Sequence, residues 1–128
     1  MNKILALMIG GALGTLFRYW VSDYAIKLFD SIFPWGTFIV NLFGSLLIGI
    51  CWGFFEKGQL NINTRLFLFV GLFGGFTTFS SFSLESLNLL KTGHAGTAIL
   101  YMLSSNILGL LFVYLGYIFG RSLSVYNR

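Results

Sequence analysis

Charged side chains are scarce in this sequence. Asp, Glu, Lys and Arg together make up 9% of its 128 residues, against roughly a quarter in an average soluble domain. A soluble domain of this length needs a charged surface to stay dispersed, and these residues are too few to build one. The eight Lys and Arg residues are scattered singly. A nucleic-acid site needs a basic patch, so nucleic acid is excluded as a partner.

Cysteine, proline and histidine are nearly absent as well, with one of each in the chain. The single cysteine, Cys51, excludes an intramolecular disulfide and a thiolate metal cluster. No His, Asp, Glu and Cys residues have the spacing of metal ligands. A nucleophile, a base and an orienting group cannot be assembled either, so the sequence does not indicate an enzyme.

Apolar residues, in contrast, are abundant at 56% of the chain, and Phe alone occupies 15 positions. This hydrophobicity excludes disorder and leaves one class, an integral membrane protein. A membrane-spanning helix needs about 20 mostly apolar residues, and four stretches meet that length. The sequence therefore predicts an all-α membrane protein, a single four-helix domain over residues 1–128, with spans at about 4–27, 32–55, 66–90 and 95–119.

Polar side chains inside the spans are the informative ones, because in hydrocarbon such groups usually face protein or water. The second span carries Thr37, Asn41 and Ser45 at four-residue spacing, which puts them on one helical face. Asn41 sits near the middle of the span, and its uncharged amide offers two donors. Two interpretations are open. One is an interhelical hydrogen bond, which is common in membranes, and the other is a functional site.

The third span has an unusual centre, Gly74-Gly75-Phe76-Thr77-Thr78. Paired glycines and paired β-branched threonines are poor helix formers, so one interpretation is a helix broken near these residues. A break frees backbone carbonyls, which suit a hard cation such as Na⁺ where they are buried in protein. The other interpretation is an intact helix whose glycines allow close packing, and the composition by itself favours it.

Beyond this centre, Phe79 and Phe82 share one helical face, and Ser80 and Ser83 form an adjacent stripe of hydroxyls. An aromatic pair at this spacing usually contacts lipid or packs in the core. The edge of a phenyl ring is, however, the positive part of its quadrupole, so ring edges beside hydroxyls can also hold an anion. A weak site of that kind releases its ion readily, as conduction requires.

Four more polar residues each allow two interpretations. In one interpretation, Tyr101 of the fourth span belongs to the interfacial aromatic belt and Ser105 hydrogen-bonds to the backbone of its own helix. In the other, both residues complete a polar path beside the third span. Arg18, about two-thirds along the first span, is a snorkelling anchor or a vestibule charge that attracts anions. Glu85 lies one turn from the end of the third span, where a mouth position is favoured over a proton relay.

Three motifs together resemble those of a known family, the Fluc (CrcB) fluoride channels. The sequence GGALGTLFRY at residues 10–19 resembles the glycine-rich motif of their first helix. The sequence GTFIVNLFGS at residues 36–45 resembles their second-helix motif, and GGFTTFSSFSLE at residues 74–85 resembles their broken third helix. In this order and at this length the motifs are highly specific, and the resemblance covers essentially the whole chain.

The resemblance implies a multi-pass channel of the bacterial inner membrane that exports toxic fluoride passively. It also assigns roles to individual residues. Arg18 resembles the basic residue of the family's aqueous vestibule, and the backbone carbonyls of Gly74 and Thr77 fall on positions that hold a central structural Na⁺ at a dimer interface. The implied fluoride path consists of a pore asparagine, two phenylalanines whose ring edges face the anions, and a polar track: Asn41, Phe79, Phe82, Ser80, Ser83, Tyr101 and Ser105.

The resemblance further implies an antiparallel, dual-topology homodimer with two pores. The four spans consume nearly the whole chain and contain no internal repeat, so an inverted half has to come from a second copy. The distribution of Lys and Arg permits insertion in both orientations, because its bias is weak. Five lie on the side of the N-terminus and three on the other: Lys3, Lys57, Arg65, Arg121 and Arg128 against Arg18, Lys27 and Lys91.

Two other functions are weighed against the channel. A small dual-topology multidrug/proton antiporter also has four helices at this length, but it needs a membrane-embedded carboxylate in the first span. That span has only Asp23, near its end. A non-transporting assembly subunit would leave the pattern of Asn41, Phe79 and Phe82 unexplained. We therefore expect a fluoride channel ahead of both.

Overall fold

The computed structural model describes residues 2–56, 58 and 60–126, and nearly all of them are helical. Lys57 and Arg128, two residues of the charge count, lie outside this range. In chain order the elements are α1 (Lys3–Leu28), α2 (Trp35–Phe55), α3 (Ile62–Arg65), η1 (Leu66–Leu72), α4 (Phe73–Phe76), α5 (Phe79–Lys91) and α6 (Ala95–Tyr126). Four segments are long and apolar enough to cross a membrane: Lys3–Leu28, Trp35–Phe55, Ile62–Lys91 and Ala95–Ser124. The predicted all-α, four-span architecture is confirmed.

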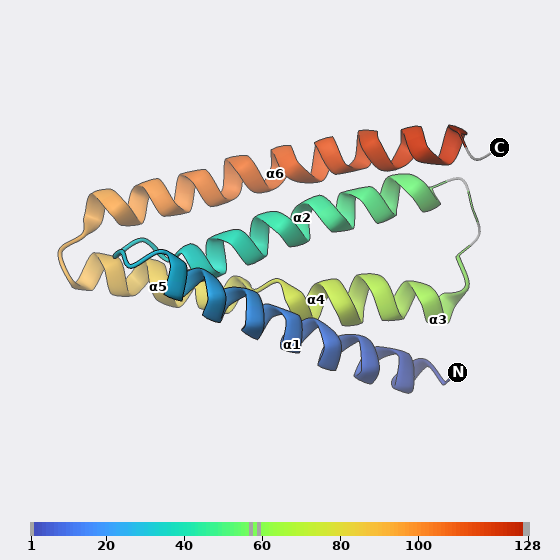
Figure 1. The fold of residues 1–128 in the computed structure, drawn as a ribbon, viewed down its shortest axis with the longest axis horizontal. Helices are drawn as coiled ribbons and strands as arrows, with labels where there is room; N and C mark the ends of the chain where they lie inside the picture. Colours follow the sequence, from blue (N-terminus) through green and yellow to red (C-terminus); the bar gives the residue numbers. More distant parts are fainter. Residues whose placement is uncertain (1, 57, 59, 127–128) are drawn as a thin grey trace.

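The spans lie side by side as an elongated bundle, in which α1 begins and α6 ends at the same end (Figure 1). The third span is one bent column built from α3, η1, α4 and α5. The helix starts follow local chemistry. The side chain of Asn2 accepts a hydrogen bond from the Ile4 amide at the start of α1, and Asn61 caps α3 in the same way. Such caps satisfy backbone donors that have no partner within the helix.

Glycines bring α2 and α6 together closely enough for backbone to touch backbone. A Cβ on Gly49 of α2 would collide with the Val113 carbonyl of α6, and one on Gly116 of α6 would collide with the Leu46 carbonyl of α2. Lipid tails are as apolar as leucine, so association of helices in a membrane depends on close packing at small residues. The glycine contacts therefore let these two spans pack closely.

A second glycine seam joins α1 to the third span. Gly14 of α1 lies against the Leu72 backbone, and a Cβ on Gly75 would stand 2.7 Å from the Gly11 carbonyl oxygen. The close packing considered for Gly75 from the sequence therefore exists. It lies on the α1 side of the column, beside the break rather than in place of it.

The third span is broken where the sequence predicted. After α4, Thr77 (φ −82°, ψ 160°) and Thr78 (φ −150°, ψ 119°) are extended, and α5 begins at Phe79. The side chain of Thr78 accepts from the Ser81 amide and so caps α5. A stretch of π-helix at Leu66–Leu72 precedes the break. The sequence of that stretch, an apolar run, did not signal it.

Candidate functional site

Asn41 of α2 closes the gap in the third span with two hydrogen bonds. Its Nδ2 donates to the Thr78 carbonyl at 3.0 Å, and the Thr78 amide donates to its Oδ1 at 2.8 Å. The interhelical interpretation of Asn41 is therefore correct. It does not exclude a functional one, because an amide has two N–H donors and this pair uses one of them.

The break also releases the two backbone carbonyls that the sequence singled out. In a continuous helix the Thr78 amide would donate to the Gly74 carbonyl, and the Ser81 amide to the Thr77 carbonyl. Here the Thr78 amide donates to Asn41, and the Ser81 amide donates to the Thr78 hydroxyl at 3.2 Å. Because both donors are engaged elsewhere, the carbonyls of Gly74 and Thr77 are available as oxygen ligands.

A cavity of about 380 Å³, the inner cavity, lies beside the break, between α2, the third span and α6. Its lining combines amide, hydroxyl, backbone and aromatic groups and includes six of the predicted site residues: Asn41, Gly74, Thr77, Phe79, Phe82 and Ser105. The side-chain oxygen of Ser105 is buried and has no hydrogen-bond partner among the described residues. A buried polar atom without a partner is costly, so this hydroxyl points to a ligand or water in the cavity.

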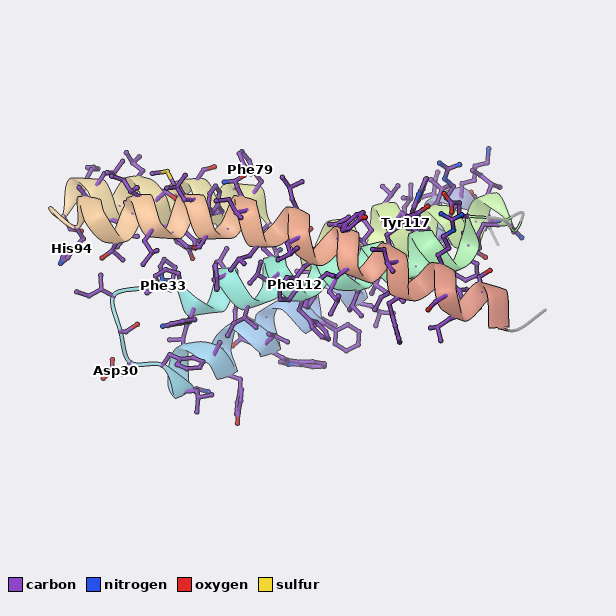
Figure 2. The ribbon with its side chains drawn as sticks, turned by 90° about the horizontal axis from the view of Figure 1, so that it is seen from above. Asp30, Phe33, Phe79, His94, Phe112 and Tyr117 are labelled. Atoms are coloured by element: carbon purple, nitrogen blue, oxygen red, sulfur yellow. The ribbon has the colours of Figure 1, made fainter. Side chains whose placement is uncertain are left out.

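Two phenylalanines form the aromatic wall of the inner cavity. The ring centroids of Phe79 and Phe82 are 5.7 Å apart, with their planes inclined by 39°. Phe79 is 77% exposed and projects from the outer face of the bundle (Figure 2). Phe82 is half-buried, and its ring lies 5.1 Å from that of Tyr101. The Phe82 ring is thus packed within the chain, whereas the Phe79 ring is exposed.

A carboxylate with two hydroxyl donors lies about one turn after Phe82 in α5. Glu85 accepts a hydrogen bond from Thr37 at 2.7 Å and another from Tyr101 at 2.8 Å. Tyr101 is completely buried, so its interpretation as an interfacial belt residue is wrong. Glu85 joins α2, α5 and α6, a position the sequence did not reveal, because its partners are distant along the chain.

A second and larger cavity of about 640 Å³, the outer cavity, lies between α1, α2 and α5. Arg18, Ser22, Thr37 and Glu85 contribute to its lining. Arg18 is half-buried beside this space, which favours the vestibule interpretation over the snorkelling one. Thr78 borders both cavities. The hydrogen-bonded pair of Asn41 and Thr78 therefore stands between the outer and the inner cavity.

The remaining predicted residues, Ser80 and Ser83, lie on the exposed side of α5 and line neither cavity. Ser83 donates to the Phe79 carbonyl of its own helix at 3.0 Å, and the Ser80 hydroxyl lies 3.3 Å from that of Thr78. Thr78 itself was not among the predicted site residues. A threonine directly before a helix is the signal that could have identified it, since threonine is a favoured cap.

Comparison with known proteins gives a consistent result. A family model described as CrcB-like protein, Camphor Resistance (CrcB), matches residues 5–117. A protein of Parabacteroides distasonis is 50% identical over 123 residues, which cover 96% of this chain and 96% of its own. Proteins of Thermus thermophilus (46% over 122 residues, 95% and 96% covered) and Aquifex aeolicus (40% over 124 residues, 96% and 100% covered) are also similar. All three are named fluoride-specific ion channel FluC.

Proposed function

Because this chain belongs to the CrcB family, we propose that it is a passive, fluoride-selective ion channel. Relatives that are 40% to 50% identical over nearly the whole chain bear that function in their names. The family is one of ion channels, so the chain is not an enzyme, and the multidrug antiporter is not favoured. The protein is a multi-pass membrane protein. We place it in the bacterial inner membrane, where it would export fluoride down its gradient.

The observation that carries this proposal is the composition of the inner cavity. Fluoride is small and strongly hydrated, so a path through protein has to replace its lost water with hydrogen-bond donors. The buried hydroxyl of Ser105 and the uncommitted N–H of Asn41 are such donors. The ring edges of Phe79 and Phe82 add weak positive potential without a full charge. Weak contacts of this kind allow the ion to leave again.

Charge in the outer cavity favours entry of an anion. Arg18 is half-buried at its wall, where a cationic side chain raises the local concentration of anions. The opposing carboxylate of Glu85 accepts two hydroxyl hydrogen bonds, from Thr37 and Tyr101. We assign the outer cavity as the vestibule. The predicted polar track of Ser80, Ser83, Tyr101 and Ser105 would continue the path.

The broken helix fits a structural Na⁺. Hard cations take oxygen ligands, including backbone carbonyls, and the carbonyls of Gly74 and Thr77 have lost their helical donors. Among the residues that the structure describes, no group of three or more His, Cys, Asp or Glu could hold a metal ion, so the carbonyls are the candidate ligands. A cation there would supply fixed positive potential beside the anion path.

A second copy of the chain, packed antiparallel, would complete the site. Gly74, Phe79, Ser80 and Ser83 are all exposed in a single chain. The inner cavity that Gly74 and Phe79 line is therefore open on that side. A homodimer would cover these residues, form two pores and share the Na⁺ at its centre. Crosslinking of Ser83→Cys in a Cys51→Ser background tests the arrangement, with Ser22→Cys of the outer cavity in the same background as the control that should not crosslink.

Efflux from liposomes tests the function itself. Purified protein is reconstituted into vesicles loaded with fluoride, and release is followed with a fluoride electrode after a potassium ionophore removes the opposing voltage. We expect rapid fluoride release and negligible chloride release under the same conditions. Release that requires a proton gradient would instead indicate an antiporter.

A further inference from the structure

Phe33 lies in the connection between α1 and α2, outside every predicted site motif. Its ring meets the Tyr101 ring edge to face, with centroids 5.4 Å apart and planes inclined by 81°. It also packs edge-on against Phe38 at 5.1 Å. Figure 2 shows Phe33 where the connection joins α2, on the side that faces α6. A residue from a surface connection thus reaches the buried core of the bundle.

The Tyr101 ring packs against three phenylalanines, and two of them, Phe82 and Phe33, are nearer than the third, Phe38, at 6.4 Å. Phe82, from the wall of the inner cavity, lies 5.1 Å from it, and Phe33 lies 5.4 Å from it. The Phe33 contact is edge to face, with planes inclined by 81°, whereas the Phe82 contact is tilted at 54°. An edge-to-face contact favours a particular ring orientation, because the positive edge of one ring meets the negative face of the other. Packing on the ring also fixes the position of the ring, and with it the position of the Tyr101 hydroxyl, which donates to Glu85 at 2.8 Å.

Phe33 also borders the outer cavity, which Arg18 and Glu85 share. It therefore lies between that cavity and the buried ring of Tyr101. Without its side chain, water would gain access to the Tyr101 ring, and the ring would lose one of its two nearest phenylalanines. The hydroxyl would then be free to leave Glu85 for water.

We propose that Phe33 is a positioning residue of the fluoride path. Its ring fixes Tyr101, which keeps the Tyr101 hydroxyl on Glu85 and supports the Phe82 ring at the inner cavity. The inference rests on the proposed function, because it concerns residues assigned to that path. It adds a residue of the α1–α2 connection, which touches none of the cavity donors directly and acts through Tyr101.

Fluoride efflux from Phe33→Ala liposomes is the first test. We expect a rate per milligram of protein reduced by roughly tenfold, less than the roughly hundredfold that a displacement of about 1 Å can cost. Phe33→Tyr, which keeps the ring, should restore the rate. The matched control is Phe54→Ala, since Phe54 is a half-buried ring in an edge-to-face pair with Phe55 (5.0 Å, 87°) that lines neither cavity. Equal rates for Phe33→Ala and Phe54→Ala would overturn the inference.

A double-mutant cycle with Tyr101→Phe separates positioning from general stability. If Phe33 acts through the Tyr101 hydroxyl, adding Phe33→Ala to Tyr101→Phe should change efflux by less than about twofold. Independent, multiplicative losses would contradict the proposal. Phe33→Leu, which retains most of the side-chain volume, is the second variant in case Phe33→Ala does not fold. It should elute like the wild type in size-exclusion chromatography and still conduct fluoride slowly. Wild-type protein without fluoride efflux would overturn the proposed function itself. Wild-type protein that conducts, together with a Phe33→Ala variant that conducts equally well, would overturn only the role of Phe33.

Discussion

Asn41 and Thr78 hold each other through a reciprocal pair of hydrogen bonds, although 37 positions separate them along the chain. One residue lies in the middle of a regular helix, and the other lies in the only extended stretch of its span. The side-chain amide of Asn41 supplies the hydrogen-bond partners that the Thr78 backbone would otherwise find in a continuous helix. Asn41 therefore satisfies the backbone of Thr78 at the break and leaves the Gly74 carbonyl without its helical donor.

Replacement of Asn41 by Asp should abolish fluoride efflux. A carboxylate cannot donate to the Thr78 carbonyl, and it places negative charge beside the path of an anion. We expect unfolding to be easier by about 1–3 kcal/mol as well, the usual cost of an unsatisfied buried acceptor. Efflux and denaturation in detergent measure the two effects. Asn63→Asp, the same change in α3 and away from both cavities, should leave both measurements unaltered.

Phe82→Ile should also abolish fluoride efflux. Isoleucine fills similar space and keeps the site apolar, but it has no positive ring edge to offer an anion. Phe112→Ile is a suitable comparison, because Phe112 is a half-buried phenylalanine of α6 outside both cavities. Wild-type rates in Phe82→Ile liposomes would remove this residue from the proposed path.

Ser105→Ala separates conduction from stability. The Ser105 hydroxyl is buried without a partner among the residues described, so its removal breaks no hydrogen bond within the chain. We expect thermal stability to be equal or slightly higher and fluoride efflux to fall severalfold. The neighbouring Ser104 donates to the Tyr101 carbonyl at 3.3 Å and lines neither cavity, so Ser104→Ala should conduct normally. Unchanged efflux in Ser105→Ala would place the path elsewhere.

Gly116→Ala should weaken the bundle. The added methyl group would collide with the Leu46 carbonyl of α2, and overpacking of this kind costs about 1–3 kcal/mol. Gly96→Ala in the same helix is the control, because a Cβ there meets nothing within 4 Å. It should leave stability unchanged or raise it by up to about 1 kcal/mol. Equal unfolding transitions for the two variants would contradict the close α2–α6 contact.

The break was expected from the resemblance of residues 74–85 to the third-helix motif of the family, and its cause is partly local. Paired glycines and threonines disfavour helix wherever they occur, and Thr78 carries its own capping group. What keeps the backbone open is Asn41, and only the fold brings that residue to Thr78. Composition by itself favoured an intact helix, since nothing local in the sequence shows that a partner amide is near.

Contacts between distant residues account for most of what the sequence did not reveal. The two donors of Glu85, Thr37 and Tyr101, lie on other helices, so the sequence did not reveal these hydrogen bonds. For the same reason the sequence left two interpretations of Tyr101 open. Phe33 lies in a short connection, where an aromatic residue carries no periodic signal. The polar pattern within each span was informative, whereas the pairing between spans was not.

The central claim is that this chain lets fluoride pass through a membrane by itself. The most direct measurement is the initial rate of fluoride efflux from liposomes that contain only the purified wild-type protein, with chloride measured in parallel. The account predicts fast fluoride release that does not saturate and needs no proton gradient. It also predicts chloride release no faster than from protein-free vesicles. Fluoride release equal to that of protein-free vesicles, or equal release of both ions, would contradict it.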